Sequence, residues 1–303
     1  MIKSFLSIVL LMTLAQAQAG LKVIYGQDNR LDLFEVSNPL HLRLAQSTAA
    51  MVGRSQIHQT GLEAFLDFKR TLETSLRLCP NERFAQQPAG STCSGFLVGE
   101  DTIVTAGHCL VLTAPTPEAA CKKYSWVFNY ALTTEKRNPS EGFSTQDVYH
   151  CKSVVTAKLT DTLDMAVIKL DRKVIGRKPL AYRTSGKISS NAQLVVIGHP
   201  SGLPTKVAAG SKVLDNSNAT TFVTNLDTFQ GNSGSAVFDA TTGMLEGILV
   251  QGKVDYRPSI PQNPYSCQVV NRCDDDGFNC ELSDPQEPKG EVVTRITEAL
   301  PYL

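Results

Sequence analysis

Short apolar runs separated by turn-forming residues dominate the chain after Cys93. Residues 96–98 and 102–105 are apolar or β-branched, and the Gly99-Glu100-Asp101 turn between them predicts two tightly joined strands. Many short strands with frequent turns favour an antiparallel sandwich or barrels over a parallel sheet. Further runs of this kind lie at 165–170, 193–197, 236–238 and 247–250, with a hairpin turn expected at 239–243.

Elsewhere the hydrophobic pattern predicts other elements. The apolar side chains of residues 62–76 recur near a period of 3.6, which predicts one amphipathic helix; they are Leu62, Phe65, Leu66, Leu72 and Leu76. Segment 253–290 is rich in Pro, Asn, Asp and Cys, and it predicts a long loop held by disulfides. The last apolar positions predict a final strand or helix packed on the body; they are Val292, Val293, Ile296, Ala299 and Leu300.

The N-terminus has the pattern of a secretory signal. Lys3 precedes an apolar stretch at residues 5–14 that is too short to span a bilayer, and small residues follow it. We therefore expect residues 1–19 to be a signal peptide and the mature protein to be soluble, either secreted or periplasmic. An uncleaved anchor or a buried strand is the alternative for this stretch.

Composition indicates the redox compartment of the protein and argues against nucleic acid and anionic lipid as partners. The 29 Lys and Arg residues balance 29 Asp and Glu residues, so no basic excess favours binding to nucleic acid or anionic lipid. An even number of cysteines in an exported chain favours disulfides, although spacing alone leaves their pairing open. The eight cysteines are Cys79, Cys93, Cys109, Cys121, Cys151, Cys267, Cys273 and Cys280.

We expect neither a metal nor a cofactor. The chain has no Cys-x2-Cys pair, and no histidine lies near the cysteine-rich C-terminal segment, which argues against a zinc site. The acidic run Asp274-Asp275-Asp276-Gly277 lacks the spacing of an EF-hand loop, so a solvated acidic loop is favoured over a calcium site.

Three segments carry residues that could act together in catalysis. His108 lies in Thr-Ala-Gly-His-Cys at 105–109, Asp164 in Leu-Asp-Met-Ala-Val-Ile at 163–168, and Ser233 in Gly-Asn-Ser-Gly-Ser at 231–235. A serine hydroxyl is a poor nucleophile unless an imidazole takes its proton and a carboxylate fixes the tautomer of that imidazole. The glycines beside Ser233 allow a sharp turn and let amide N–H groups approach a developing oxyanion.

In these motifs the chain resembles the chymotrypsin-fold (trypsin-like) serine proteases, and within them the bacterial glutamyl-endopeptidase-like branch. Segment 105–109 is similar to the family's Thr-Ala-x-His-Cys, Asp164 begins a strand like its Asp-Ile-Ala-Leu, and 231–235 matches the bacterial Gly-Asn-Ser-Gly-Ser. Ala236 stands where Pro is commoner. Weaker likenesses lie at 195–200, at 247–249, and at 23–30, where the mature chains of the branch begin.

The resemblance implies an architecture. We expect an all-β fold of two six-stranded antiparallel β-barrels, with a short helix near the N-terminus and a C-terminal helix. An N-terminal segment at 20–89 would pack on the barrels. Residues 90–180 would form the first barrel, and residues 181–303 would form the second barrel with a disulfide-pinned loop at 253–290.

The resemblance also implies roles. His108 would act as general base and then general acid, Asp164 would orient its imidazole, and Ser233 would attack the scissile carbonyl and become acylated. The N–H groups of Gly231 and Ser233 would form the oxyanion hole. Cys93 would pair with Cys109 in a disulfide that closes the histidine loop.

Substrate specificity is less determined by the sequence. Asp227 corresponds to the trypsin residue at the floor of the pocket for P1, the residue before the cleaved bond, where it pairs with Lys or Arg. The alternative is a loop aspartate that hydrogen-bonds to backbone. Glu-specific members of the branch carry a pocket histidine where this chain has Leu249. We expect an edge strand at Val250, Gln251 and Gly252 to pair with extended substrate.

Activation is expected to differ from that of animal trypsin-like enzymes. These carry Asp immediately before the nucleophile, and a freed N-terminal ammonium pairs with it. Asn232 stands at that position and cannot supply a full counter-charge, so we expect no such ion pair. Cleavage after Lys22 remains an option for processing at the mature start.

The leading hypothesis is an exported serine endopeptidase, monomeric, acting on protein or peptide substrates, with a basic P1 side chain as one candidate preference. A non-catalytic, protease-like binding protein or toxin is the alternative. A serine esterase ranks last, because its Gly-x-Ser-x-Gly motif and its Ser-Asp-His order are both absent.

Overall fold

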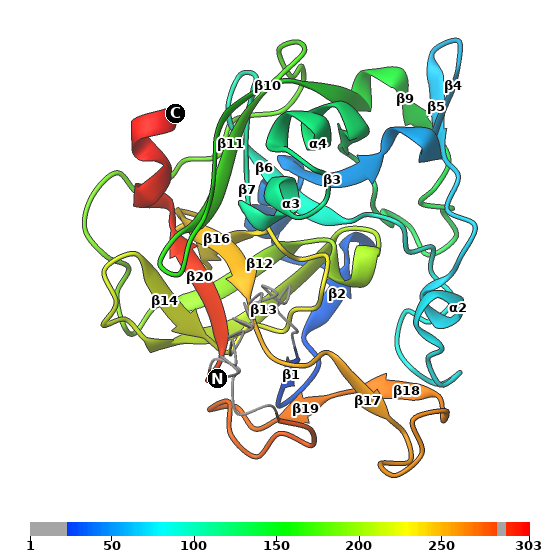
Figure 1. Ribbon diagram of the computed structural model, residues 1–303, viewed down its shortest axis with the longest axis vertical. Helices are drawn as coiled ribbons and strands as arrows, with labels where there is room; N and C mark the ends of the chain where they lie inside the picture. The colour runs from blue at the N-terminus through cyan, green and yellow to red at the C-terminus, as the bar shows by residue number, and fades with distance from the viewer. Residues whose placement is uncertain (1–22, 284–288) are drawn as a thin grey trace, which may run out of the picture.

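Two closed antiparallel β-barrels, one above the other in Figure 1, make up most of the computed structural model. The structure describes residues 23–283 and 289–303. The expected signal peptide at 1–19 lies outside these residues. The two barrels confirm the predicted all-β class and two-barrel architecture. None of the helices in the described residues could serve as a membrane span.

The first barrel closes in the order β10-β11-β7-β6-β3-β8. In its interior a large side chain packs against a glycine: Trp126 is almost fully buried, and a Cβ on Gly95 would lie 2.4 Å from the Trp126 ring. Strands β6 and β7 are joined by the predicted 99–101 turn. The six strands are β3 (Thr48–Gly53), β6 (Cys93–Gly99), β7 (Thr102–Thr105), β8 (Tyr124–Val127), β10 (Val148–Leu159) and β11 (Asp164–Leu170).

The second barrel closes because β12 pairs with both β13 and β15, and a further strand, β2 (Arg30–Asp32), adds to β13. One continuous apolar core extends across both barrels. The expected hairpin between residues 236 and 250 is present. The six strands are β12 (Gln193–Gly198), β13 (Lys206–Asp215), β14 (Thr221–Thr224), β15 (Ala236–Asp239), β16 (Leu245–Gln251) and β20 (Glu291–Arg295).

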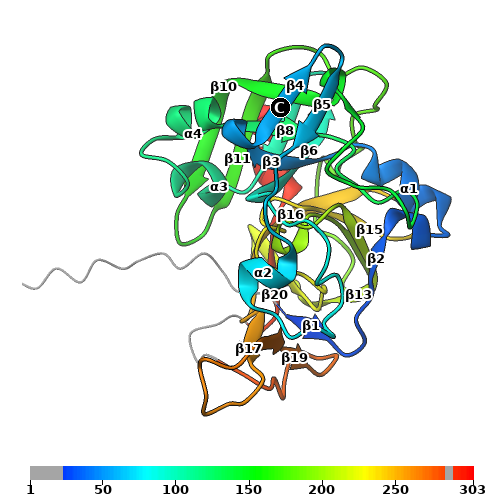
Figure 2. The ribbon, with the colours of Figure 1, turned by 90° about the vertical axis from the view of Figure 1, so that its right-hand side faces the viewer.

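Smaller elements surround the barrels. Figure 2 shows β17 and β19 on the side of the second barrel away from the first, and α2 at the height of the second barrel. The small strands are β1 (Ile24–Tyr25), β4 (Ile57–Thr60), β5 (Glu63–Leu66), β9 (Phe143–Ser144), β17 (Tyr256–Pro258), β18 (Gln268–Val270) and β19 (Arg272–Cys273). The α-helices are α1 (Pro39–Ala45), α2 (Leu72–Leu76), α3 (His108–Val111) and α4 (Pro117–Lys123). The 3-10 helices are η1 (Leu33–Glu35), η2 (Arg54–Gln56), η3 (Thr145–Asp147), η4 (Pro200–Gly202) and η5 (Ile296–Tyr302).

The expected helix over residues 62–76 is wrong. Leu62 lies at the tip of the β4–β5 hairpin with 79% of its surface exposed, and Leu66 ends β5. Only residues 72–76 are helical, as α2. Gly61 adopts φ +61 in the hairpin turn, a conformation that favours glycine and that ends any helix here. The helical spacing of the leucines is therefore a coincidence between a strand and a short helix.

The N-terminal segment enters the barrels instead of packing on them. Residues 20–89 are expected to pack on the barrels, whereas β3 is a member of the first barrel and β2 extends the second. Both strands pair with segments far along the chain: β3 with β6 and β8, and β2 with β13. Pairings of that kind leave no local signal in the sequence.

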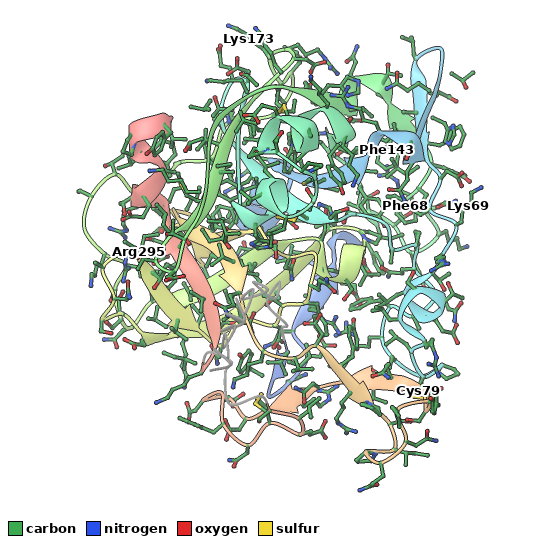
Figure 3. All side chains as sticks on the ribbon, in the orientation of Figure 1. Phe68, Lys69, Cys79, Phe143, Lys173 and Arg295 are labelled. Carbon is green, nitrogen blue, oxygen red and sulfur yellow. A yellow bond between two sulfur atoms is a disulfide. The ribbon has the colours of Figure 1, made fainter. Side chains whose placement is uncertain are left out.

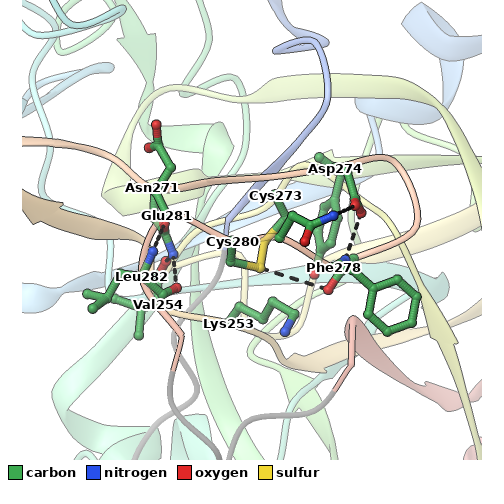
Figure 4. The surroundings of a disulfide bond; sticks show 12 residues. Lys253, Val254, Asn271, Cys273, Asp274, Phe278, Cys280, Glu281 and Leu282 are labelled. Carbon is green, nitrogen blue, oxygen red and sulfur yellow. Dashed lines mark hydrogen bonds between the residues drawn. A yellow bond between two sulfur atoms is a disulfide. The ribbon is translucent and has the colours of Figure 1, made fainter.

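All eight cysteines form disulfides. Cys93–Cys109 agrees with the pairing that the resemblance implies. Two further bridges hold the 253–290 segment as expected: Cys79–Cys267 joins it to the residues after α2, where Figure 3 labels Cys79 beside the β17–β18 hairpin. Cys273–Cys280 closes a small loop within the segment (Figure 4). The fourth bridge, Cys121–Cys151, connects α4 to β10.

Candidate active site

The carboxylate of Asp164 holds both the ring and the backbone of His108. Its Oδ2 lies 2.7 Å from Nδ1 of His108, and its Oδ1 accepts the backbone N–H of His108 at 3.0 Å. A carboxylate beside Nδ1 favours the tautomer with the proton on Nδ1, which leaves Nε2 as an acceptor. The pair is therefore arranged as a base and its orienting group.

Local sequence explains how these two side chains meet. Asp164 begins β11, and His108 begins α3 just after β7, which pairs with β11. Gly107 lies where a Cβ would come within 1.8 Å of the Lys158 carbonyl oxygen, so only glycine lets the chain pass this close to β10. From the second barrel, the Thr294 hydroxyl donates to the backbone carbonyl of Asp164 at 3.0 Å.

Ser233 lies in a tight loop that leads into β15. Gly231 and Gly234 flank it with φ of +94 and +83, and a Cβ on Gly234 would lie 2.2 Å from the carbonyl oxygen of Ser94. Gly234 also donates its N–H to the carbonyl of Leu249 in β16 at 2.8 Å. The loop therefore contacts both barrels. Gly231 and Gly234 both adopt a positive φ that favours glycine, and at Gly234 there is also no space for a side chain.

The backbone of Ser233 is fixed next to His108. Its carbonyl oxygen accepts the N–H of Ser94 at 2.8 Å and lies 3.7 Å from Sγ of Cys109, the neighbour of His108. Among residues 23–283 and 289–303, neither Nε2 of His108 nor Oγ of Ser233 has a hydrogen-bond partner. Catalytic hydrogen bonds of unliganded sites are often this open and close when substrate binds.

Two backbone N–H groups point away from the loop's own hydrogen bonds. The carbonyl of Gln230 accepts the N–H of Ser201 at 2.5 Å, and the carbonyl of Asn232 accepts the N–H of Ser235 at 2.8 Å. In a trans peptide the following N–H points opposite to the carbonyl. The N–H groups of Gly231 and Ser233 therefore face the other way, and neither finds an acceptor within the described residues.

Ser94 is a site residue that the sequence analysis missed. Its fully buried hydroxyl donates to the Gly231 carbonyl at 2.9 Å and accepts the N–H of His199 at 3.0 Å. Together with its backbone bond to Ser233, it ties β6 of the first barrel to the loop of the second. A lone serine after Cys93 gives no sequence signal for this role.

Asp227 does not present a free carboxylate to a pocket. Its Oδ1 accepts the N–H of Tyr25 and its Oδ2 the N–H of Asn29, both at 2.8 Å, and its side chain is buried. Burial raises the pKa of this carboxyl to about 7, although the two backbone N–H groups act in the opposite direction. The structure thus favours the second interpretation from the sequence, an aspartate that hydrogen-bonds to backbone.

The expected substrate strand has an unpaired edge. The pairing of β16 with β15 covers residues up to Ile248, and Leu249 donates its N–H to Ser235 at 3.0 Å. Beyond Leu249, among the residues that the structure describes, no strand continues this pairing on the β15 side. Gln251 is exposed, whereas Val250 and Gly252 are buried.

Asn232 is buried and its side-chain oxygen accepts the Ser235 hydroxyl at 3.1 Å, so its amide supports the turn that carries Ser233.

Two clusters resemble metal sites in composition. The Sγ atoms of Cys93 and Cys109 lie near a ring nitrogen of His108, but both sulfurs are joined in a disulfide and are not thiolate ligands. In the acidic run, the carboxylate of Asp274 accepts the N–H of Asp276, the N–H of Phe278 and the side-chain amide of Asn279 (Figure 4). It therefore organises a turn.

Comparison with known proteins supports the fold. A family model described as a trypsin-like peptidase domain matches residues 93–248. Vibrio cholerae VesB protease is similar with a TM-score of 0.51 and 12% identity, over 93% of this chain and 66% of that chain. At this identity the likeness extends to the fold alone.

Two other solved structures are also similar. A Glu endopeptidase in complex with MPD has a TM-score of 0.44 and 17% identity, over 76% of this chain and 88% of that chain. Rv3671c from M. tuberculosis H37Rv, in an inactive form, has a TM-score of 0.45 and 12% identity, and the match covers 92% of this chain and 94% of that chain. No curated protein sequence matches.

Proposed function

We propose that this chain, which belongs to the trypsin-like peptidase family, is a serine endopeptidase that uses Ser233 as its nucleophile. The observation that carries the proposal is the hydrogen-bonded pair of His108 and Asp164, next to a serine whose backbone is fixed by the residues around Cys93–Cys109. The buried loop with two unengaged N–H groups supports it further.

In the proposed reaction, Nε2 of His108 accepts the proton of Ser233 Oγ as that oxygen attacks the scissile carbonyl carbon. The negative charge that develops on the carbonyl oxygen is stabilised by the N–H groups of Gly231 and Ser233, each worth about 3 kcal/mol in comparable sites. His108 then donates its proton to the leaving amine. In the second half of the reaction His108 takes a proton from water, the water oxygen attacks the acyl carbon, and His108 returns the proton to Ser233 Oγ as the acid product leaves. Asp164 stabilises the imidazolium throughout.

The substrates in this proposal are proteins or peptides that lie extended along residues 250–252. A preference for a basic P1 side chain through Asp227 receives no support from its geometry, since both carboxylate oxygens are engaged by backbone. The four disulfides support an oxidising compartment, in line with a secreted or periplasmic location.

Labelling with a fluorophosphonate probe tests the proposal, because an activated serine oxygen attacks the phosphorus of the probe, displaces fluoride and forms a stable phosphonate ester. We expect a single adduct on Ser233, located by mass spectrometry, together with cleavage of an unfolded protein substrate. Ser233→Ala should abolish both, whereas the exposed-site control Ser185→Ala should retain both. A folded protein that neither labels nor cleaves would be the non-catalytic binding protein of the alternative hypothesis.

A further inference from the structure

Residue Gln230 is held at both of its backbone polar groups. Its N–H donates to Oδ2 of Asp255 at 2.9 Å, and its carbonyl accepts the N–H of Ser201 at 2.5 Å. Asp255 is buried, whereas Gln230 is exposed. Because Gln230 immediately precedes Gly231, these two bonds set the direction of the peptide that carries the Gly231 N–H.

Gly231 itself leaves that direction open. Glycine has no Cβ and adopts positive and negative φ about equally readily, so the peptide between Gln230 and Gly231 could rotate by half a turn. In the structure Gly231 has φ +94, and the Gln230 carbonyl is turned toward Ser201. After such a rotation the carbonyl oxygen would lie where the N–H now points, and it would repel the negative charge of an oxyanion instead of stabilising it.

The residue after Asp255 supports the second of these bonds. The hydroxyl of Tyr256 lies 2.7 Å from Oγ of Ser201, the residue whose N–H meets the Gln230 carbonyl. Ser201 adopts φ +53, a conformation that is unfavourable for a residue with a Cβ and that needs support from its surroundings. The ring of Tyr256 also packs on the ring of Phe229, with 5.2 Å between the ring centres. Asp255 and Tyr256 therefore hold Gln230 and its neighbours together.

The segment that carries Asp255 and Tyr256 is itself anchored. Tyr256 begins β17, which pairs with β18, and the two strands form a sheet of their own below the second barrel in Figure 1. The backbone carbonyl of Asp255 accepts the N–H of Asn271 at 2.8 Å. The Cys79–Cys267 disulfide, just before β18, ties this hairpin to the residues after α2. The hairpin is therefore fixed by contacts other than those it makes with Gln230.

We infer that Asp255 and Tyr256 are positioning residues that keep the Gly231 N–H turned toward the oxyanion. The inference rests on the proposed endopeptidase function and names what keeps its oxyanion hole formed. Asp255 acts through the N–H of Gln230, and Tyr256 acts through Ser201. A donor that is already in place needs no reorganisation when the charge develops, which is what makes an oxyanion hole effective. Loss of either support should therefore lower turnover far more than it weakens binding of the uncharged substrate.

The test uses a peptidyl trifluoromethyl ketone and the corresponding alcohol, both built on the peptide sequence that the wild-type protein cleaves fastest. Oγ of Ser233 adds to the ketone carbon, its proton passes to His108, and the former carbonyl oxygen becomes an oxyanion, whereas the alcohol cannot react. Asp255→Ala should raise the inhibition constant of the ketone by about 100-fold and lower kcat by a similar factor. The KM and the inhibition constant of the alcohol should change little.

Two further variants separate positioning from folding. Asp255→Asn retains a side-chain oxygen that can accept the Gln230 N–H, so it should restore most of the kcat that Asp255→Ala loses. Tyr256→Phe keeps the ring on Phe229 and loses only the hydroxyl, so it should fold even if Asp255→Ala does not, and it should lower kcat by about 10-fold. Tyr265→Phe, at an exposed position between β17 and β18, is its matched control and should leave kcat intact.

The inference is overturned if a folded Asp255→Ala or Tyr256→Phe protein keeps the kcat of wild type, if binding of the ketone and of the alcohol weakens equally, or if Asp255→Asn is as slow as Asp255→Ala. Fluorophosphonate labelling separates these results from failure of the proposed function. In each of them the wild-type protein still labels at Ser233 and cleaves peptide, whereas a wild type that does neither would refute the proposed function and this inference together.

Discussion

The carboxylate of Asp164 contacts His108 twice, at ring Nδ1 (2.7 Å) and at the backbone N–H (3.0 Å). The second contact fixes the backbone of His108, and the imidazole cannot turn without breaking the first. This double contact sets both the position and the tautomer of the proposed base. It also makes the effect of an isosteric change at residue 164 easy to interpret.

Asp164→Asn should lower kcat/KM by about 10⁴-fold at neutral pH with little change in thermal stability. An amide can donate to Nδ1 and so favours the wrong imidazole tautomer, while the side-chain volume is preserved. The measurement is steady-state hydrolysis of a peptide substrate alongside thermal unfolding. Asp161→Asn, at an exposed position nearby, is the matched control and should leave the rate intact. Equal rates for the two variants would contradict the assignment of Asp164.

Ser94→Ala should lower both stability and turnover. The change leaves the Gly231 carbonyl and the His199 N–H without their partner in a buried site, at a cost of about 1–3 kcal/mol each. Displacement of Gly231 should then reduce kcat more than it raises KM, by up to about 100-fold. Urea unfolding and peptide kinetics measure the two effects. An unchanged kcat in a destabilised variant would mean that Ser94 supports the fold but not the oxyanion loop.

Removal of a disulfide should destabilise the protein more when the disulfide closes a longer loop. Cys79 and Cys267 are 188 residues apart, whereas Cys273 and Cys280 are 7 apart. The chain-entropy model gives about 5 kcal/mol for the first and about 2 kcal/mol for the second. Paired Cys→Ser variants, made in a Ser233→Ala background to prevent self-digestion, can be compared by urea unfolding. A larger loss for the shorter loop would refute this ranking.

Stability should depend on pH through Asp227. Burial raises the pKa of its carboxyl from 3.8 to about 7, so between these values the folded state binds more protons than the unfolded state. The stabilising contribution of this group is thus complete below about pH 4 and is lost as pH rises through 7, a difference of about 4 kcal/mol.

The measurement for Asp227 is urea unfolding of wild type and Asp227→Asn at several pH values, again with Ser233→Ala in both. The advantage of wild type should shrink steadily from pH 4 to pH 8. Two pH profiles that run parallel would show that Asp227 keeps an ordinary pKa despite its burial.

Local sequence patterns predicted the elements that are formed by residues close together in the chain. The runs at 96–98 and 102–105 became β6 and β7 because apolar strand residues and a turn lie next to each other in the chain. The same reasoning failed at residues 62–76, where a hairpin tip at Leu62 and a short helix happen to share helical spacing. Periodicity cannot distinguish these cases when an exposed leucine stands in a turn.

Only the site residues that lie within the sequence motifs could be predicted. The motifs around His108 and Asp164 anticipated a pair that the structure brings into contact. The sequence could not show that Asp227 is bonded to Tyr25 and Asn29, because these partners lie at the other end of the chain.

The parallel pairing of β1 with β19 has a consequence for biosynthesis. Residues 24 and 25, at the start of the described chain, pair with residues 272 and 273, and Val23 to Tyr25 are buried in the folded protein. A nascent polypeptide must therefore be almost finished before its opening strand can dock. Translation products that stop short of residue 272 would lack the partner strand of β1.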